Sequence, residues 1–141
     1  LYSKVLDPDA AVDAVELYRW DGDTALTVTY DNADHAGCYD LQKLAQKDMY
    51  EVFFGGNWPM VRITGGAENG RRLLVLKDSY ANALLPFAAA DYEMIAAVDL
   101  RYYLGSLTEL IQTEGITDVL VLYSTSAFMS EAKIDRLGLG K

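Results

Sequence analysis

Short apolar runs dominate the second half of the chain and predict buried strands joined by helices. Leu73 to Leu76 are four consecutive apolar residues, and residues 94–100 and 118–123 hold two further runs. Such runs are typical of strands covered on both faces, as in a parallel sheet. Helical spacing over residues 81–90 and 104–113 separates them. The resulting strand–helix–strand–helix–strand order predicts parallel strands with right-handed crossovers.

The first half of the chain predicts an antiparallel appendage to that sheet. Residues 15–20 and 25–30 alternate between apolar and polar positions, and Asp21-Gly22-Asp23 between them is typical of a hairpin turn. We therefore expect a three-layer α/β fold with a mainly parallel sheet and an N-terminal β-hairpin. The other expected elements are a helix over residues 41–53, which Asp40 caps, a strand over residues 60–64 and a last helix over residues 124–132.

Composition narrows the classes of function. The chain has 141 residues, 51% of them apolar, which favours a single globular domain over residues 1–141. A net charge of -9 argues against nucleic acid as a partner. No metal or other cofactor is expected, because Cys38 is the single cysteine and the aspartates of residues 31–40 lack the spacing of a calcium loop.

The segment from Arg72 to Asn82 places a serine where a strand meets a helix. The apolar run ends at Asp78-Ser79, and a segment with helical spacing begins at Ala81. This arrangement has the geometry of a nucleophile elbow, in which the free N–H groups of the helix start lie beside a developing oxyanion. The same residues are equally typical of a strand, a capping residue and a helix without chemistry. Both interpretations stay open at this point.

Polar residues that end neighbouring parallel strands share one edge of the sheet. Asp99 and Arg101, which follow the second of the apolar runs, could belong to a site at this edge or form a structural ion pair. Donors for an oxyanion are the Ser79 N–H and, depending on the direction of the strand that follows them, the Gly56 N–H and the Asn57 amide. The three runs deliver to this edge Asp78 and Ser79, then Asp99 and Arg101, then Ser124, Thr125 and Ser126.

A serine nucleophile also needs a base, and the sequence offers no convincing one. His35 is the single histidine, and its Asp, Asn and Gly neighbours are typical of a solvated surface loop. Lys77 would point to the opposite side of the strand from Asp78. We therefore expect the histidine that activates Ser79 to lie outside these 141 residues.

Residues Leu74 to Asn82, followed by Pro86-Phe87 and then by Val98 to Tyr103, resemble the bacterial DHHW family. That family is similar to the SGNH-hydrolase-like domains of alginate O-acetylation proteins. The resemblance spans nearly the whole chain and implies the C-terminal portion of a larger domain with an SGNH or flavodoxin-like fold. The Asp-His-His-Trp motif that names the family is expected before Leu1.

The resemblance also implies roles for individual residues. Ser79 takes the nucleophile position and Asp78 the position before it, while an Asp-x-His pair upstream of Leu1 would complete the triad. Lys77 is a departure, since relatives usually have glycine there in a Gly-Asp-Ser block. Arg101 falls near a position where relatives place a polar site residue.

Three functions remain in competition. The first is a serine O-acyl esterase or O-acetyltransferase that acts on an acylated polysaccharide or another ester, in the cell envelope or outside the cell as the resemblance implies. The second is a polysaccharide-binding module that stacks sugars on aromatic residues. The third is a structural envelope module, in which Ser79 would be buried and bonded to backbone. The aromatic candidates are Trp58, Tyr80, Tyr102 and Tyr103.

Overall fold

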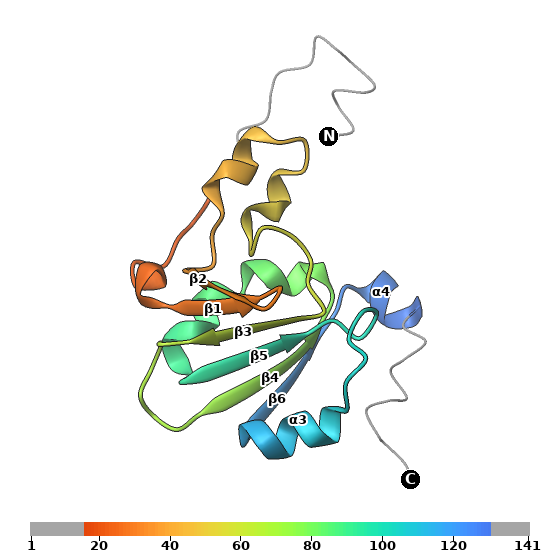
Figure 1. Ribbon diagram of the computed structural model, residues 1–141. Coiled ribbons are helices and arrows are strands. Elements are labelled where there is room, and N and C mark those ends of the chain that lie inside the picture. Colours follow the sequence, from red (N-terminus) through yellow and green to blue (C-terminus); the bar gives the residue numbers. More distant parts are fainter. Residues whose placement is uncertain (1–15, 131–141) are drawn as a thin grey trace.

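A computed structural model describes residues 16–130, which form one six-stranded mixed sheet with helices packed against it (Figure 1). The strands are β1 (Thr27–Tyr30), β2 (Ala33–Ala36), β3 (Met60–Thr64), β4 (Arg72–Lys77), β5 (Met94–Val98) and β6 (Asp118–Leu122). The α-helices are α2 (Leu85–Ala88), α3 (Leu107–Glu114) and α4 (Thr125–Ser130), and the 3-10 helices are η1 (Asp23–Ala25), η2 (Leu41–Ala45), η3 (Met49–Val52), η4 (Ser79–Ala83) and η5 (Ala89–Asp91).

The order of strands across the sheet is β2-β1-β3-β5-β4-β6. The second half of the chain behaves as predicted, because β4 lies between β5 and β6 and is parallel to both. β3 instead pairs antiparallel with β5 and with β1, and β1 pairs antiparallel with β2. The expectation of a mainly parallel sheet is therefore wrong. The sheet is mixed because β5 lies between β3 and β4, antiparallel to the first and parallel to the second.

The N-terminal hairpin exists, but it uses other residues than predicted. It pairs β1 with β2 and turns at Asp31 and Asn32, which have φ angles of 50° and 57°. Two positive φ angles at the centre of a two-residue turn match the twist of paired strands, and Asp and Asn tolerate them better than most residues. Residues 16–20 form no strand, and Val15 lies outside the described residues. The turn predicted at Asp21 to Asp23 leads into η1 instead.

The helix predicted over residues 41–53 is two short 3-10 helices, η2 and η3. Asp40 caps η2 as predicted, since its side chain accepts a hydrogen bond from the Gln42 N–H at 3.1 Å. Asp48 repeats this cap on the Tyr50 N–H at 3.1 Å and starts a second helix, which interrupts the expected one.

The later helices largely follow the sequence pattern. The segment over residues 81–90 is split into η4, α2 and η5, with Pro86 in the first turn of α2, where its missing N–H costs no hydrogen bond. α3 ends where Gly115 adopts a φ of 61°. α4 begins at Thr125, and the predicted continuation beyond Ser130 lies outside the described residues. Within residues 16–130 no helix has the length and apolarity required to cross a membrane.

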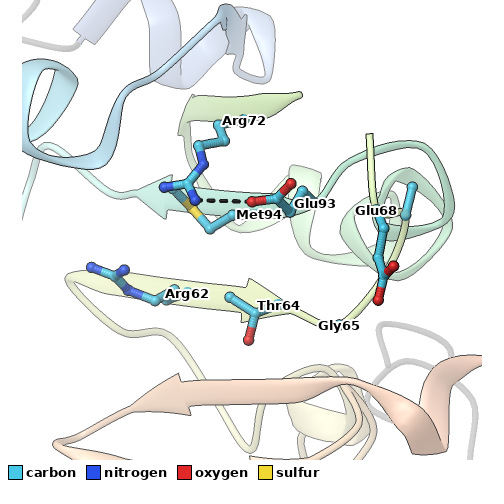
Figure 2. Close-up of a pocket in the computed structure, with 9 residues that line it drawn as sticks. Arg62, Thr64, Gly65, Glu68, Arg72, Glu93 and Met94 are labelled. Carbon is cyan, nitrogen blue, oxygen red and sulfur yellow. Dashed lines mark hydrogen bonds and ion pairs between the residues drawn. The ribbon is translucent and has the colours of Figure 1, made fainter. Parts of the chain in front are cut away.

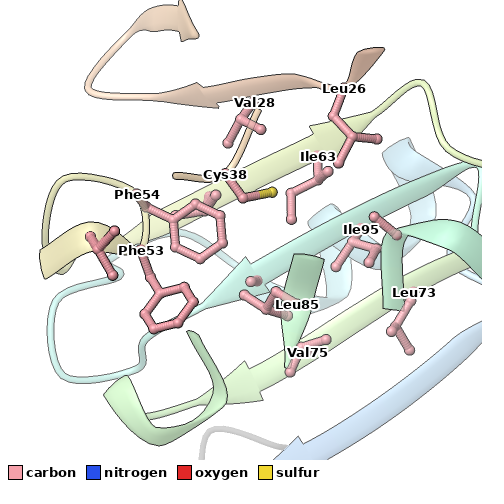
Figure 3. Packing of buried hydrophobic residues seen from close by; sticks show 14 residues of the cluster. Leu26, Val28, Cys38, Phe53, Phe54, Ile63, Leu73, Val75, Leu85 and Ile95 are labelled. Carbon is pink, nitrogen blue, oxygen red and sulfur yellow. The ribbon is translucent and has the colours of Figure 1, made fainter. Parts of the chain in front are cut away.

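The two faces of β4 feed two separate cores. One face packs against α2 and against side chains from the first half of the chain, as Figure 3 shows, and the other packs against α3. Burial on both faces explains the continuous apolar run of this strand. Leu73, Val75 and Leu85 belong to the first core, and Leu74, Leu76, Leu107 and Leu110 belong to the second.

β6 is much less covered than its sequence predicts. Among residues 16–130 it lies at the edge of the sheet and pairs only with β4. Val119 and Val121 are 55% and 43% exposed on one face, and Leu120 is 36% exposed on the other. The prediction of a third fully buried strand is therefore wrong, because an apolar run reports the preference of a strand and not its place in the sheet.

Candidate active site

The predicted site residues gather at the carboxyl end of the parallel strands. β4 ends before Asp78 and β5 ends before Asp99. β3 runs in the opposite direction, with Met60 beside Val98, so the segment that precedes β3 reaches the same edge. A hydrogen bond of 3.0 Å from the Asp99 N–H to the Pro59 carbonyl fixes this arrangement. The direction of β3 is therefore the one that a contribution from Gly56 and Asn57 requires.

Asp78 organises the strand-to-helix connection. Its Oδ1 accepts a hydrogen bond from the Tyr80 N–H at 2.9 Å and caps η4, while its Oδ2 accepts from the backbone N–H and the hydroxyl of Ser124. Partial burial opposes ionisation of this carboxyl, but the bonds from Ser124 and Tyr80 outweigh it and hold the pKa below its ordinary value. Asp78 is therefore an ionised group with a structural role, and its three hydrogen bonds go to Tyr80 and Ser124.

Ser79 is the first residue of η4 and is partly exposed. Within residues 16–130 its hydroxyl has no hydrogen-bond partner. Its carbonyl accepts a hydrogen bond from the Tyr50 hydroxyl at 2.8 Å, and Ser79, Tyr50 and Tyr80 line a pocket of about 280 Å³. Ser79 therefore lines a small cavity at the sheet edge, and a nucleophile requires such access to a substrate.

Behind Ser79 lies a chain of three polar side chains. The Lys77 Nζ donates to the Asn82 Oδ1 at 2.7 Å, and the Asn82 Nδ2 donates to the Asn57 Oδ1 at 3.2 Å. Lys77 and Asn82 are only 1% and 2% exposed, whereas Asn57 is exposed. Burial lowers the pKa of Lys77 to about 8, partly offset by the Asp99 carboxylate. These hydrogen bonds thus connect the buried ammonium group of Lys77 to the exposed Asn57 at the edge of the sheet.

The turn before Asn57 is unusual, because Phe54, Gly55 and Gly56 all have positive φ angles of 61°, 67° and 146°. Glycine accepts such angles without steric cost, and buried Phe54 is held there by a 2.8 Å bond from its N–H to the Cys38 carbonyl. The Gly56 N–H donates to the Phe53 carbonyl at 3.3 Å. Gly56 therefore shapes the turn that presents Asn57, and its own N–H is engaged.

Asp99 and Arg101 form the ion pair that the sequence left open as one alternative. The Arg101 Nε lies 2.9 Å from the Asp99 Oδ1, and a terminal guanidinium nitrogen lies 2.6 Å from the Oδ2. Asp99 is fully buried and Arg101 is 42% exposed. The hydrogen bond to Asp99 raises the pKa of Arg101, which therefore keeps its charge. The pair closes the end of β5 next to the Lys77 side chain.

His35 lies far from Ser79. It is exposed on β2, where its ring stacks on Tyr30 with a centroid separation of 3.9 Å. Between β2 and β4 lie β1, β3 and β5. At a strand spacing of about 4.8 Å, four steps across the sheet are roughly 19 Å. A direct proton transfer between His35 and Ser79 is therefore impossible in this fold.

The aromatic candidates divide into two kinds. Tyr80 and Tyr102 are 75% and 53% exposed at the site edge. Trp58 instead is partly buried against the core, where it stacks on Tyr30, and its indole N–H donates to the Phe54 carbonyl at 2.8 Å. Trp58 therefore packs the fold and does not offer a free ring face in the way that Tyr80 does.

Two residues of this region escaped the sequence analysis. Asn82 could have been noticed as a polar residue inside an otherwise apolar helical segment, a position that is usually buried with a partner. Tyr50 gives no such signal, because it comes from η3 and its contact with Ser79 spans 29 residues.

A second pocket, of about 430 Å³, lies at the opposite edge, where β4 and β5 begin and β3 ends (Figure 2). Its two arginines are already paired, Arg62 with Glu114 and Arg72 with Glu93. It contains none of the predicted site residues, and its cationic groups are neutralised by neighbouring carboxylates. Across the part of the chain that the structure describes, no cluster of His, Cys, Asp and Glu residues could hold a metal ion.

The chain is similar to two solved proteins. No family model matches it, and neither does any curated protein. A DHHW family protein from Eubacterium siraeum is 32% identical over 82% of this chain and 40% of its own, with a TM-score of 0.64. Bacillus cereus PatB1 is 30% identical over 72% of this chain and 36% of its own, with a TM-score of 0.61, and its structure with a sulfonyl adduct gives 0.60. The chain spans less than half the length of these proteins. Their similarity in sequence and fold supports the DHHW family as the family of this chain.

Proposed function

We propose that this chain is part of a DHHW-family protein with an SGNH-like catalytic domain, and that Ser79 is the nucleophile of an O-acyl esterase or O-acetyltransferase. The observation that carries the proposal is the position of Ser79. Its hydroxyl is unpartnered within residues 16–130, and Ser79 lines a pocket and is the first residue of a helix capped by Asp78. A serine that only stabilised the fold would be buried and bonded to backbone.

The chemistry follows from this geometry. The Ser79 Oγ attacks the carbonyl carbon of an ester, and its proton passes to a histidine that we place in a segment before Leu1. The Ser79 N–H and the Asn57 amide stabilise the oxyanion. Collapse of the intermediate expels the alcohol, which takes the proton from the histidine, and leaves an acyl-serine. Water then completes hydrolysis, or a sugar hydroxyl of an exported or cell-envelope polysaccharide accepts the acyl group.

The similarity to PatB1 also supports a nucleophilic serine. PatB1 has been solved with a sulfonyl adduct. A sulfonyl group becomes bonded to a protein when a reactive nucleophile displaces its leaving group, as activated serines do. The similarity of the two folds is consistent with a reactive serine in this chain as well.

The proposal is tested by hydrolysis of p-nitrophenyl acetate. We expect turnover by the longer protein that includes the segment before Leu1, and a loss of about 10³-fold or more in Ser79→Ala, since triad members typically contribute this much. Ser126→Ala, which removes an exposed serine from the same edge, should keep full activity. The 141-residue chain alone should be nearly inactive. Ser79-dependent turnover by this chain at the rate of the longer protein would contradict the proposed source of the base.

A polysaccharide-binding module is the second candidate, and the exposure of Tyr80 and Tyr102 favours it. Flat aromatic faces at a sheet edge stack on sugar rings without chemistry. Binding on a glycan array that survives Ser79→Ala and is lost in Tyr80→Ala and Tyr102→Ala would favour this function. Binding that needs none of these residues would contradict both candidates.

A further inference from the structure

Lys77 is a buried cation at a position that faces the candidate site from behind. Its side chain is 1% exposed and its Nζ lies 2.7 Å from the Asn82 Oδ1. Removing an ammonium group from water is costly unless hydrogen bonds and opposite charges compensate it. The side chain of Asn82 is therefore the polar group that holds the Lys77 ammonium at this spot.

The ammonium group fixes the direction of every hydrogen bond that follows. A protonated lysine can only donate, so Asn82 must turn its Oδ1 toward Lys77 and its Nδ2 away. The Nδ2 then donates to Asn57, which must present its own Oδ1. The Nδ2 of Asn57 is consequently turned away from Asn82, and within residues 16–130 it donates to no other group.

Ser79 and Asn82 lie on one side of the same short helix. η4 is a 3-10 helix, in which residues three positions apart eclipse each other, and Ser79 and Asn82 are separated by three. Asn57 contacts Asn82 and is exposed, so it lies at the rim of the same side. From this rim, the free amide group of Asn57 would donate a hydrogen bond to the negative charge that develops on a Ser79 adduct.

We propose that Lys77 is a positioning residue, which acts through Asn82 to hold the Asn57 side chain with its Nδ2 donor toward the Ser79 edge. This inference deepens the function proposed above and rests on it for the role of the Asn57 donor.

The protonation of Lys77 gives the proposal a measurable signature. Burial lowers its pKa to about 8, while the charged groups around it act in both directions, Asp99 and Asp78 to raise the pKa and Arg101 to lower it. A neutral amine can accept as well as donate, so the enforced direction of the hydrogen bonds is lost above this pH. The orientation of both asparagine amides should therefore depend on pH.

The test follows the side-chain amide signals of Asn57 and Asn82 by ¹⁵N NMR in the 141-residue chain between pH 6 and 10. We expect both pairs of signals to move together with a midpoint near pH 8. Lys77→Met keeps an apolar stem without the charge and should abolish this transition in both pairs of signals. Asn82→Asp should abolish it in the signals of the Asn57 amide. Lys43→Met, which removes a partly exposed lysine from the Glu51 pair, serves as the matched control and should change nothing.

Two results would overturn the inference. The first is a wild-type chain in which the Asn57 amide shows no transition near pH 8, a result that requires no variant to fold. The second is found in the longer protein, where Lys77→Met should lower kcat for p-nitrophenyl acetate about 10-fold or more with KM little changed, as for the loss of an oxyanion donor. An unchanged kcat with Ser79-dependent turnover contradicts the role of Lys77. Absence of any Ser79-dependent turnover contradicts the proposed function instead, and the NMR transition still decides the orientation of Asn57.

Discussion

The carboxylate of Asp78 accepts two hydrogen bonds from Ser124, from the N–H at 3.0 Å and from the hydroxyl at 2.8 Å. This contact fastens the end of β4 to the end of β6. Its other oxygen caps η4 through the Tyr80 N–H. One buried carboxylate thus holds two neighbouring strand ends and the helix that begins with Ser79, so the position of the candidate nucleophile depends on it.

Removal of this carboxylate should destabilise the protein strongly. We expect Asp78→Ala to lower the free energy of unfolding by about 3 kcal/mol, because three hydrogen bonds to a charged acceptor are lost. Ser124→Ala removes one of them and should cost about 1 kcal/mol. Urea unfolding of the two single variants and the double variant measures their coupling. Costs that simply add would contradict the proposed link between the strand ends.

Lys77 should give the stability a distinctive dependence on pH. Its pKa in the folded state, about 8, lies below its ordinary value of 10.5, so between these values the unfolded chain binds more protons than the folded one. The free energy of unfolding should therefore rise with pH across this window, by up to about 3 kcal/mol relative to Lys77→Met. Denaturant titrations at pH 7, 9 and 10.5 measure the difference, and a constant difference would show that Lys77 is solvated.

The Asp99–Arg101 pair should matter more than the surface pairs. Arg101→Met leaves the fully buried Asp99 carboxylate without its bidentate partner and should cost about 3 kcal/mol of stability. Arg101→Lys should recover only part of this loss, since an ammonium group cannot bind both oxygens in the same way. Breaking the Lys43–Glu51 pair with Lys43→Met should cost less than about 1 kcal/mol. If Arg101→Met and Lys43→Met lowered the stability equally in thermal unfolding, Asp99 would be in contact with solvent, and this prediction would be wrong.

The exposed edge strand β6 should make the 141-residue chain associate with itself. Val119 and Val121 are exposed on a strand whose outer backbone groups have no partner strand among residues 16–130. Sedimentation velocity should show association that increases with concentration and that disappears in Val119→Lys/Val121→Lys. Gln112→Lys/Thr113→Lys adds the same charge to exposed positions of α3 and should leave the association unchanged. Equal effects of the two double variants would point to net charge and not to the strand edge.

The local elements of the second half of the chain were predictable because their causes are local. The apolar runs identify β4, β5 and β6, and Gly115 ends α3 with a positive φ angle. The order of the strands in the sheet was not predictable, since no local sequence pattern indicates that β5 lies between β3 and β4. The hairpin was misplaced because Asp31-Asn32 lacks the glycine that usually marks such a turn.

The candidate site was predictable to the same degree. The joint position of Asp78, Ser79, Asp99 and Arg101 follows from the rule that strands of one direction end at one edge. Asn57 reaches this edge because β3 is antiparallel to β5, which the sequence left open. The contacts that complete it depend on tertiary structure. A lysine that closes an apolar run is expected to reach solvent, and only the fold shows that Lys77 is buried against Asn82.

The reactivity of Ser79 toward a sulfonyl fluoride tests its assignment as the nucleophile most directly. The longer protein that includes the segment before Leu1 is treated with phenylmethanesulfonyl fluoride, and its peptides are analysed by mass spectrometry. We predict a single sulfonyl group on the peptide that contains Ser79, no label in Ser79→Ala, full label in Ser126→Ala and much slower labelling of the 141-residue chain. A longer protein that remains unlabelled at Ser79, or that is labelled elsewhere with Ser79 intact, would contradict the assignment of Ser79 as the nucleophile.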